Sequence, residues 1–221
     1  MRTTALASLA FAALTSAALG APSGPVELTE AQMDQVTAGT SAEAFGDSFT
    51  AGRSWFGLLD LNGHNYAKGG AAANPAFANP SSNTFAKQVQ SWHGAGEPGA
   101  DAVVVFIGIN DILEATTSFS GSRAAYTKAL KELSAADGPL VLVKAPDLGA
   151  MPDFKGTSEA AALTKKTVTW NKFVGQQANA FNAKVVDLFK KLSSPSLIGS
   201  DGLHPNSRGQ QVIANAIKSK L

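Results

Sequence analysis

Three residue types that together perform nucleophilic catalysis occur here in suitable local settings. Ser48 directly follows Gly46-Asp47, and Asp201 lies three residues before His204. A serine hydroxyl is a weak nucleophile until a base removes its proton, and His204 is the candidate base. At this spacing Asp201 can accept the Nδ1 proton of His204 and fix the imidazole tautomer. These residues predict serine–histidine–aspartate chemistry, the alternative being that His204 is only a polar turn residue.

The other two histidines are weaker candidates for the base. His64 lies beside Asn62-Gly63, and His93 precedes a glycine-rich loop. Neither is predicted to have a carboxylate at a useful local spacing. His204 is therefore the preferred base.

Strand and helix signals alternate along the chain and would position these residues. The strongest strand candidate is the apolar run from Ala102 to Ile107 (AVVVFI), which is typical of a buried parallel strand. Other strands are predicted over 42–45, 140–143 and 185–189, with a further one ending at 66–67. Helices are predicted over 122–136, 158–181 and 207–221. This alternation predicts a parallel sheet with helices on both faces.

Short polar and glycine-containing motifs follow the strand candidates. In an open parallel sheet, ligands bind at the carboxyl ends of the strands. The Ser48 motif comes after the first strand, Gly69-Gly70 after the second, and residues 108–111 (GIND) after the third. With the Asp–His pair near the C-terminus, they bring a nucleophile, a backbone N–H donor and the amide of Asn110 to one crevice.

Four blocks in this order resemble the GDSL/SGNH hydrolase superfamily. The blocks are FGDSFTAG (45–52), NYAKGGAAA (65–73), VVVFIGINDI (103–112) and DGLHP (201–205). KAPDLGAMP (144–152) and NTFAKQVQSW (83–92) resemble connecting segments of its lipase and acyltransferase-like branch, and the whole resemblance covers residues 42–221. It implies an α/β fold, a three-layer α/β/α sandwich with a five-stranded, flavodoxin-like parallel sheet, and a serine esterase or lipase without a cofactor.

The resemblance also implies a role for each candidate site residue. It assigns a catalytic triad to Ser48, His204 and Asp201. It assigns an oxyanion hole to the N–H of Ser48, the N–H of Gly70 and the side-chain amide of Asn110. Such donors stabilise the charge that develops on the carbonyl oxygen during acyl transfer.

Residues beside these positions are expected to have supporting roles. Gly69 competes with Gly70 for the second donor, but Gly70 lies five residues after Asn65, which is the spacing of the family's second block. Asp47 and Asp111 are expected to order their turns by hydrogen bonds rather than to act in catalysis.

Two positions depart from the family pattern. Glu43 lies in an alanine-rich first strand, where a β-branched run is usual, and this concerns the stability of the strand more than the chemistry. Thr50 stands two residues after Ser48, so the G-x-S-x-G elbow of α/β-hydrolases is absent.

Aromatic residues near the motifs could line an acyl groove or pack in the core, and the sequence favours neither reading. They are Phe49, Trp55, Phe56, Phe77 and Trp92. The acyl chain length and the alcohol of the substrate are left open.

The first twenty residues have the pattern of a secretory signal peptide. Arg2 supplies a positive charge, residues 5–19 carry none, and the small residues Ala18 and Gly20 suit cleavage after Gly20. A membrane anchor is the alternative, but the stretch is short and alanine-rich for a span. We expect a signal peptide (1–20), an N-terminal arm (21–40) and a hydrolase domain (41–221), in a protein that is secreted, extracellular or periplasmic.

Composition excludes several other classes of function. The 221 residues include no Cys, which excludes a disulfide framework, a thiolate nucleophile and Cys-ligated zinc. A net charge of +1 gives no electrostatic footprint for nucleic acid, and three dispersed His without an H-E-x-x-H motif disfavour a metal enzyme.

The sequence thus predicts a secreted monomer without metal, cofactor or membrane span that hydrolyses lipid or acylated carbohydrate esters. Two alternatives remain open. One is an acyltransferase that uses the same acyl-enzyme, and the other is an inactive secreted binding module that has kept the fold.

Overall fold

A parallel sheet forms the centre of the described part of the chain. The computed structural model describes residues 40–52, 54–81, 83–116, 118–136 and 138–221. The strands stand in the spatial order β1 (Ala42–Gly46), β2 (Ala102–Phe106), β3 (Leu140–Lys144) and β4 (Lys184–Asp187), and each neighbouring pair is parallel. All five residues of β1 and of β2 are buried, as the apolar run at 102–107 predicts.

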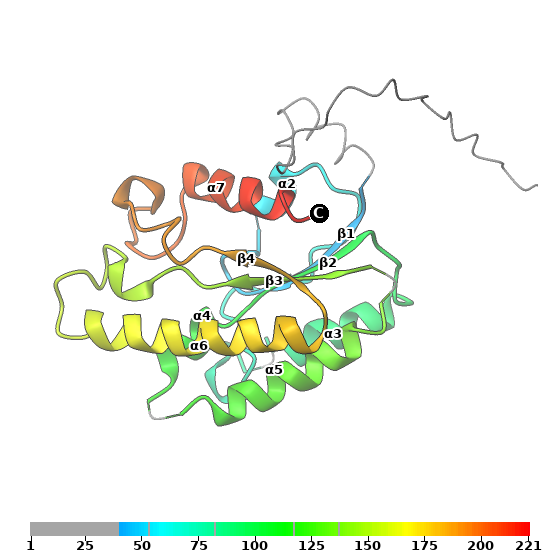
Figure 1. Cartoon of the computed structure of the whole chain (residues 1–221), viewed down its shortest axis with the longest axis horizontal. Coiled ribbons are helices and arrows are strands. Elements are labelled where there is room, and N and C mark those ends of the chain that lie inside the picture. Colours follow the sequence, from blue (N-terminus) through cyan, green and yellow to red (C-terminus); the bar gives the residue numbers. More distant parts are fainter. Residues whose placement is uncertain (1–39, 53, 82, 117, 137) are drawn as a thin grey trace, which may run out of the picture.

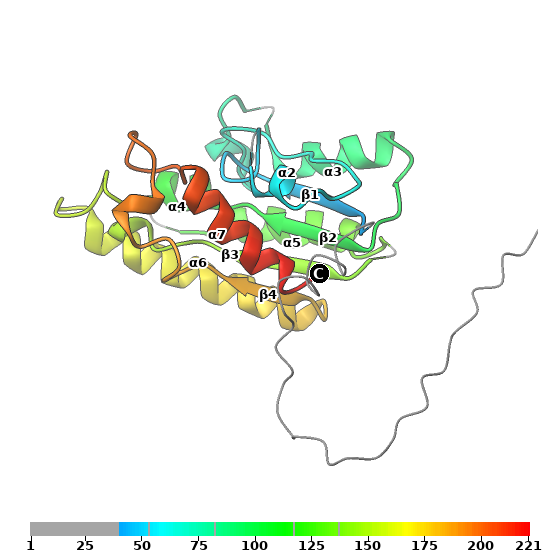
Figure 2. The same ribbon diagram turned by 90° about the horizontal axis from the view of Figure 1, so that it is seen from above.

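Helices cover both faces of this sheet, which confirms the three-layer α/β/α sandwich (Figures 1 and 2). One face carries α2 (Trp55–Leu58) and α7 (Ser207–Lys218). The opposite face carries α3 (Phe85–Gly94), α4 (Ile109–Glu114), α5 (Ser120–Leu133) and α6 (Ala160–Ala180). Short 3₁₀ turns lie at η1 (Pro75–Phe77), η2 (Leu148–Ala150) and η3 (Pro195–Leu197).

The long helices form where apolar residues recur every three or four positions. In α6, Leu163, Trp170 and Val174 are buried, and in α7, Ile213 and Ile217 are buried. This spacing produces one apolar face, which the sheet covers. The predicted helices at 122–136, 158–181 and 207–221 correspond to α5, α6 and α7 with small shifts at their ends, whereas α2, α3 and α4 were not predicted.

The predicted fifth strand is the main difference in the sheet. Segment 62–68 runs along the outer edge of β1, where Ala44 donates its N–H to the carbonyl of His64 (2.9 Å) and accepts from the N–H of Tyr66 (2.8 Å). It forms only isolated bridges, so the described residues contain four strands rather than five. Gly63 has a φ of 137°, which interrupts the extended backbone that a continuous ladder requires.

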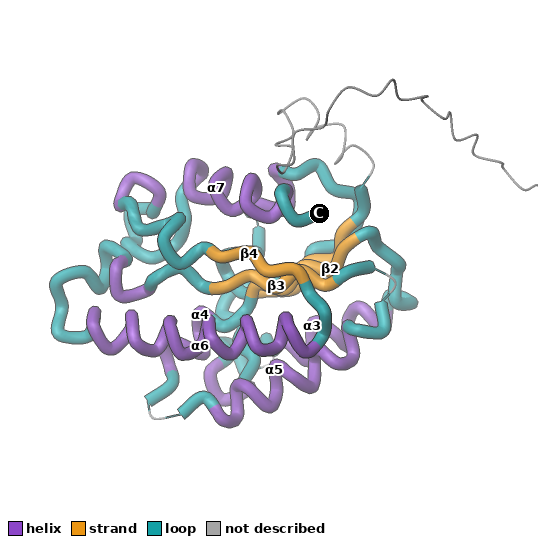
Figure 3. Tube along the Cα trace, in the orientation of Figure 1, coloured by secondary structure: helices purple, strands orange, loops and turns teal. Residues whose placement is uncertain are grey.

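The position of segment 62–68 determines where the site lies. After β1 the chain runs to segment 62–68 on one side of β1, whereas β2 lies on the other side. The neighbours of β1 in the chain thus lie on opposite sides of it, which makes its carboxyl end a switch point. Ligands bind at such points in open α/β sheets. In Figure 3, teal loops follow the carboxyl ends of β3 and β4 on the left of the picture.

The N-terminal expectations lie outside this description. The predicted signal peptide and the predicted arm up to residue 39 fall before the first described residue. Among the helices of the described residues, none is long and apolar enough to span a bilayer.

Candidate active site

The turn that carries Ser48 is fixed by a buried side chain from α3. Gln88 accepts a hydrogen bond from the N–H of Gly46 (2.9 Å) and donates one to its carbonyl (2.7 Å). A Cβ at position 46 would come within 2.5 Å of the carbonyl oxygen of Phe106, so only glycine fits there. The chain therefore leaves β1 at one defined point, two residues before Ser48.

The structure brings Ser48, His204 and Asp201 together although Ser48 and His204 are 156 positions apart. The Oγ of Ser48 lies 2.8 Å from Nε2 of His204, and Nδ1 of His204 lies 2.7 Å from Oδ2 of Asp201. The hydrogen bond between Ser48 and His204 is partly buried, whereas the side chains of His204 and Asp201 are 43% and 53% exposed. The three groups form one continuous hydrogen-bonded row.

The loop of Asp201 holds its carboxylate in the charged form. Its Oδ1 accepts the N–H groups of Leu203 and His204, each at 3.0 Å. These bonds, first the one from Leu203, hold the pKa of Asp201 below its usual value, and the contact with the His204 side chain lowers it further. Gly202 makes the tight turn possible, because its φ is 73° and a Cβ would meet Asp153.

The C-terminal helix joins this loop to the nucleophile turn. Asn206 caps α7 by accepting the N–H groups of Arg208 and Gly209. One turn later, Gln210 accepts the N–H of Trp55 (2.9 Å) and donates to the carbonyl of Phe49 (3.4 Å). The helix that follows the histidine loop thus holds the turn of Ser48.

Gly70 has a conformation that no other residue type would adopt easily. Its φ is 71°, and a Cβ there would lie 1.9 Å from the carbonyl oxygen of Asn79. A Cβ on Gly69 would meet nothing within 4 Å. The backbone requirement for glycine therefore lies at Gly70, the position preferred in the sequence.

Asn110 contacts the turn that contains Gly70. Its Nδ2 donates to the carbonyl of Ala71 at 2.8 Å. The same turn starts at Lys68, whose N–H donates to the carbonyl of Gly46 at 3.2 Å. The segments that carry Gly70 and Asn110 therefore meet beside the end of β1, and the second hydrogen of the Asn110 amide is left for another acceptor.

Asp47 connects the nucleophile turn to the start of α4. Its fully buried carboxylate accepts the N–H groups of Phe49 (3.1 Å), Gly108 (3.2 Å) and Ile109 (3.1 Å). Burial raises its pKa to about 7, against the lowering effect of these hydrogen bonds. Its role is to order the turn, as expected.

Asp111 makes the second link between these loops. Its carboxylate accepts the N–H of Ala73 at 2.8 Å and the N–H of Asn74 at 3.0 Å. Burial raises the pKa of this group as well. Together, Asp47 and Asp111 tie three successive loops into one scaffold under the site.

The prediction that neither of the other histidines has a carboxylate at a useful local spacing is wrong for His93. His93 contacts Glu97, four residues on (2.6 Å), and also Glu132 (3.4 Å), while His64 contacts the buried Glu43 at 3.2 Å. The spacing of His93 and Glu97 is that of one helical turn and was visible in the sequence. His93 belongs to α3 and Glu43 to the first half of β1, so neither pair includes the turn of Ser48. His204 therefore remains the candidate base.

The aromatic residues near the motifs are mostly core. Phe49, Trp55 and Trp92 are at most 1% exposed, and Phe56 and Phe77 are partly buried against the core. An acyl groove lined by all five is therefore wrong.

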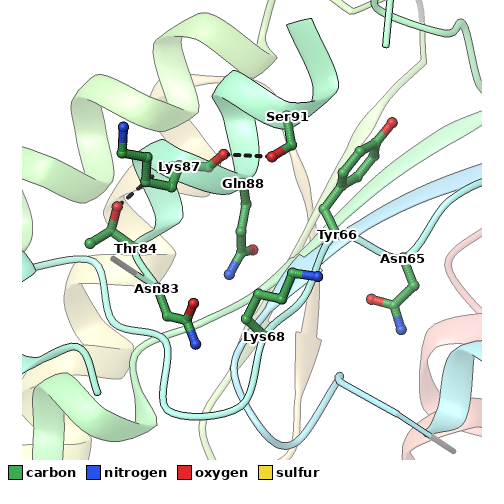
Figure 4. A pocket seen from close by; sticks show the side chains of 8 residues that line it. All are labelled: Asn65, Tyr66, Lys68, Asn83, Thr84, Lys87, Gln88 and Ser91. Atoms are coloured by element: carbon green, nitrogen blue, oxygen red, sulfur yellow. Dashed lines mark hydrogen bonds between the residues drawn. The ribbon is translucent and has the colours of Figure 1, made fainter. Parts of the chain in front are cut away.

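Two cavities adjoin the loops of the site. One, of about 270 Å³, lies between segment 65–68 and α3 and is lined by polar side chains (Figure 4). Asn83 on its rim donates to the carbonyl of Gly69 at 2.9 Å. The other, of about 440 Å³, is lined by Leu113, three residues after Asn110, and by Phe154.

Comparisons with known proteins agree with this architecture. A parallel sheet with a serine, a histidine and an aspartate in a hydrogen-bonded row near the carboxyl end of β1 is the arrangement of an SGNH-type hydrolase. Residues 44–212 match the GDSL-like Lipase/Acylhydrolase family. The chain belongs to this family and is a carboxylic ester hydrolase, as predicted.

Solved structures share the fold at low sequence identity. A member of the lipolytic protein G-D-S-L family from Veillonella parvula has a TM-score of 0.60 and 19% identity, over 81% of this chain and 96% of that one. Axe2, an acetylxylan esterase from Geobacillus stearothermophilus, has a TM-score of 0.58 and 17% identity, over 82% and 94%. A protein from Lactobacillus plantarum has a TM-score of 0.63 and 21% identity, over 82% and 96%. No curated protein matches by sequence.

Proposed function

We propose that the protein hydrolyses carboxylic esters through an acyl-enzyme on Ser48, with His204 as general base and acid and Asp201 as the carboxylate that orients it. One observation carries the proposal: the hydrogen-bonded row from Ser48 Oγ to His204 Nε2 (2.8 Å) and from His204 Nδ1 to Asp201 Oδ2 (2.7 Å). Both distances suit proton transfer between positioned groups.

The reaction proceeds in two halves. His204 takes the proton of Ser48 as its Oγ attacks the ester carbonyl, and then gives this proton to the departing alcohol. Water attacks the acyl-enzyme in the second half, with His204 again as the base. Asp201 keeps Nδ1 protonated, so Nε2 is the nitrogen that accepts.

The negative charge of the tetrahedral intermediate requires hydrogen-bond donors. We assign this role to the N–H groups of Ser48 and Gly70 and to the free amide hydrogen of Asn110. The contact of Asn110 with Ala71 supports the assignment, because it fixes the amide against the Gly70 turn. Donors fixed before the reaction need no reorganisation as the charge forms.

Solved variants of Axe2 support the same residue types. Three are described as catalytic mutants and replace a serine, an aspartate or a histidine by alanine. In Axe2 the aspartate precedes the histidine by three positions, which is the spacing of Asp201 and His204.

We further propose that the substrate carries a short acyl group on a large polar alcohol, such as an acetylated carbohydrate. The exposure of His204 and Asp201 leaves the leaving-group side open to a bulky alcohol. Phe49 and Trp55, which could have lined a long apolar groove, are buried in the core. Secretion, proposed from the pattern of residues 1–20, would give the protein access to acetylated carbohydrates outside the cell.

Replacement of Ser48 by alanine tests the mechanism. S48A is expected to lose hydrolysis of 4-nitrophenyl acetate and labelling by a fluorophosphonate, while its circular dichroism spectrum stays that of the wild type. S134A, which removes an exposed hydroxyl, is the matched control and should keep both. Turnover by S48A would refute the acyl-enzyme, and unlabelled folded wild type would favour an inactive binding module.

Product analysis separates hydrolysis from acyl transfer. With an added alcohol acceptor, a hydrolase releases the free acid as its main product, whereas an acyltransferase forms a new ester. Mass analysis of the exported protein tests secretion, and an N-terminus at Ala21 is expected.

A further inference from the structure

A third cavity, of about 460 Å³, lies between the start of α5 and the outer side of α6. Positively charged and hydroxyl side chains line much of it: Arg123, Lys165, Lys166, Thr116, Ser118 and Thr169. This grouping of cations is unusual in a chain whose net charge is only +1. None of these residues takes part in the proposed chemistry.

Arg123 is held in a fixed position at this cavity. The Cζ of its guanidinium lies 5.5 Å from the ring centre of Phe173 and 6.0 Å from that of Phe119. Its Nε is buried and has no hydrogen-bond partner among the described residues. A buried charged donor without a partner is costly, and a planar guanidinium matches the two oxygens of a carboxylate or a phosphate.

None of the three cations forms an ion pair within the described part of the chain. The ion pairs found there involve Lys144 and the histidines, and none includes Arg123, Lys165 or Lys166. Like charges that share one cavity repel each other, and a bound anion would remove this repulsion.

The basic cavity adjoins the 440 Å³ cavity described above. The two share Ala162 and Lys166 as lining residues. In the adjoining cavity, Leu113 belongs to the helix that begins beside Asn110, and Phe154 follows Asp153.

The loop at Phe154 also contacts the histidine loop. Asp153 donates its N–H to the carbonyl of Gly202 at 3.1 Å. The adjoining cavity is therefore lined by the helix that carries Asn110 and by the loop that contacts the histidine loop. Glu114 and Glu159 line the adjoining cavity and would repel an anion there. An anion is therefore expected in the basic cavity and not in the adjoining one.

We propose that the basic cavity binds an anionic oxygen group of the ester substrate, a carboxylate or a phosphate, and so selects acidic esters. This inference rests on the proposed function, since it places the anionic group on the molecule whose ester reaches Ser48. Arg123 supplies the directional contact, and Lys165 and Lys166 supply charge.

Matched ester pairs test this selectivity. The first pair is the acetyl ester of methyl glucuronoside, which has a free carboxylate, against that of methyl glucoside, and the second is the acetyl ester of glycerol 1-phosphate against that of glycerol. We expect the wild type to have a higher kcat/KM for the charged member of at least one pair. The pair that shows the preference distinguishes a carboxylate from a phosphate.

Two variants test whether the basic cavity causes this preference. They lie on different helices, so misfolding of one leaves the other as a test. R123Q and the double variant K165A/K166A should each reduce it about tenfold, the effect of losing a contact to a charged group. Both should keep wild-type hydrolysis of 4-nitrophenyl acetate. K128A/K131A removes two exposed lysines from the later part of α5 and should change nothing. No charge preference in the wild type, or one that survives both variants, would overturn the proposal.

A binding titration keeps this test separate from the proposed function. At constant ionic strength, unesterified methyl glucuronoside or glycerol 1-phosphate, or both, should bind the full-length protein, and methyl glucoside and glycerol should not. Binding that R123Q and K165A/K166A weaken supports the site whether or not esters are turned over. Equal binding of charged and neutral compounds contradicts it, whereas loss of all ester turnover contradicts only the proposed function.

Discussion

The carboxylate of Asp47 accepts the backbone N–H of Ile109 at 3.1 Å. Asp47 precedes Ser48 and Ile109 precedes Asn110, so one buried hydrogen bond sets the distance between the segments that carry the proposed nucleophile and the proposed amide donor. Because the carboxylate is fully buried, its charge state affects both the stability of the fold and the shape of the site.

Asp47 should make the stability of the fold depend on pH. Its pKa is raised to about 7 in the folded protein, chiefly by burial, from an ordinary value near 3.8. A raised pKa means that the folded state binds the proton more tightly than the unfolded state. The stabilisation from this group is therefore complete below its ordinary pKa and is lost as the pH rises through about 7. Urea unfolding from pH 5 to 8.5 should show the free energy of unfolding falling across this range.

The D47N variant provides the comparison. It should show a weaker pH dependence across the same range, since asparagine does not titrate. The exposed Asp60 gives a matched control, D60N, which should keep the wild-type slope. A wild-type slope in D47N would show that another group, such as Asp111 nearby, dominates.

Replacement of Asn110 by alanine should slow turnover without unfolding the protein. Loss of one oxyanion donor reduces kcat by about 10²–10³-fold. Hydrolysis of 4-nitrophenyl acetate under saturating conditions measures this, and N215A on the exposed side of α7 is the control. An unchanged kcat in N110A would remove Asn110 from the proposed oxyanion hole.

The two adjacent glycines should respond differently to alanine. G70A places a Cβ against the carbonyl of Asn79 at a residue with a φ of 71°, whereas G69A meets nothing within 4 Å. We expect G70A to lose about 1–3 kcal/mol of stability and most of its activity, and G69A to retain both. Thermal unfolding and ester hydrolysis, measured together, compare the pair. Equal behaviour of the two variants would argue against a special role for Gly70.

Replacement of Asp201 by asparagine should slow turnover. Only neutral imidazole can accept the proton of Ser48, and the proposed role of Asp201 is to keep Nε2 as the accepting nitrogen. The hydrogen bonds from Leu203 and His204 hold the pKa of Asp201 below its usual value, so this carboxylate is charged in the neutral range. D201N should reduce kcat by up to about 10⁴-fold, as expected when the tautomer is no longer fixed. D153N, on the neighbouring loop, serves as the control. An unchanged kcat in D201N would contradict the orienting role of Asp201.

Local patterns predicted the elements with strong periodicity and missed those that depend on distant contacts. The run 102–107 identifies β2 because six consecutive apolar residues rich in valine are typical of a buried parallel strand. The short α4 has no such pattern. Its N-cap is Gly108, whose φ is 129°, and the N–H groups of Gly108 and Ile109 are bound by Asp47 from another loop.

The same limit applies to the site. Ser48, Asp201 and His204 could be named from the sequence because their motifs are short and local. The supports Gln88 and Gln210 could not, since each acts on a segment at least 42 positions away. A glutamine on the buried side of a helix, such as Gln88 among Phe85, Val89 and Trp92, is the one signal that could have indicated them.

The contact of Gln210 with Phe49 and Trp55 has a consequence for the order in which the enzyme is completed. α7 lies more than 150 positions after the turn of Ser48, yet its Gln210 fastens that turn. A chain that lacks α7 keeps the proposed base His204 but loses this anchor. The proposed nucleophile is therefore in place only once α7 has packed against the rest of the fold.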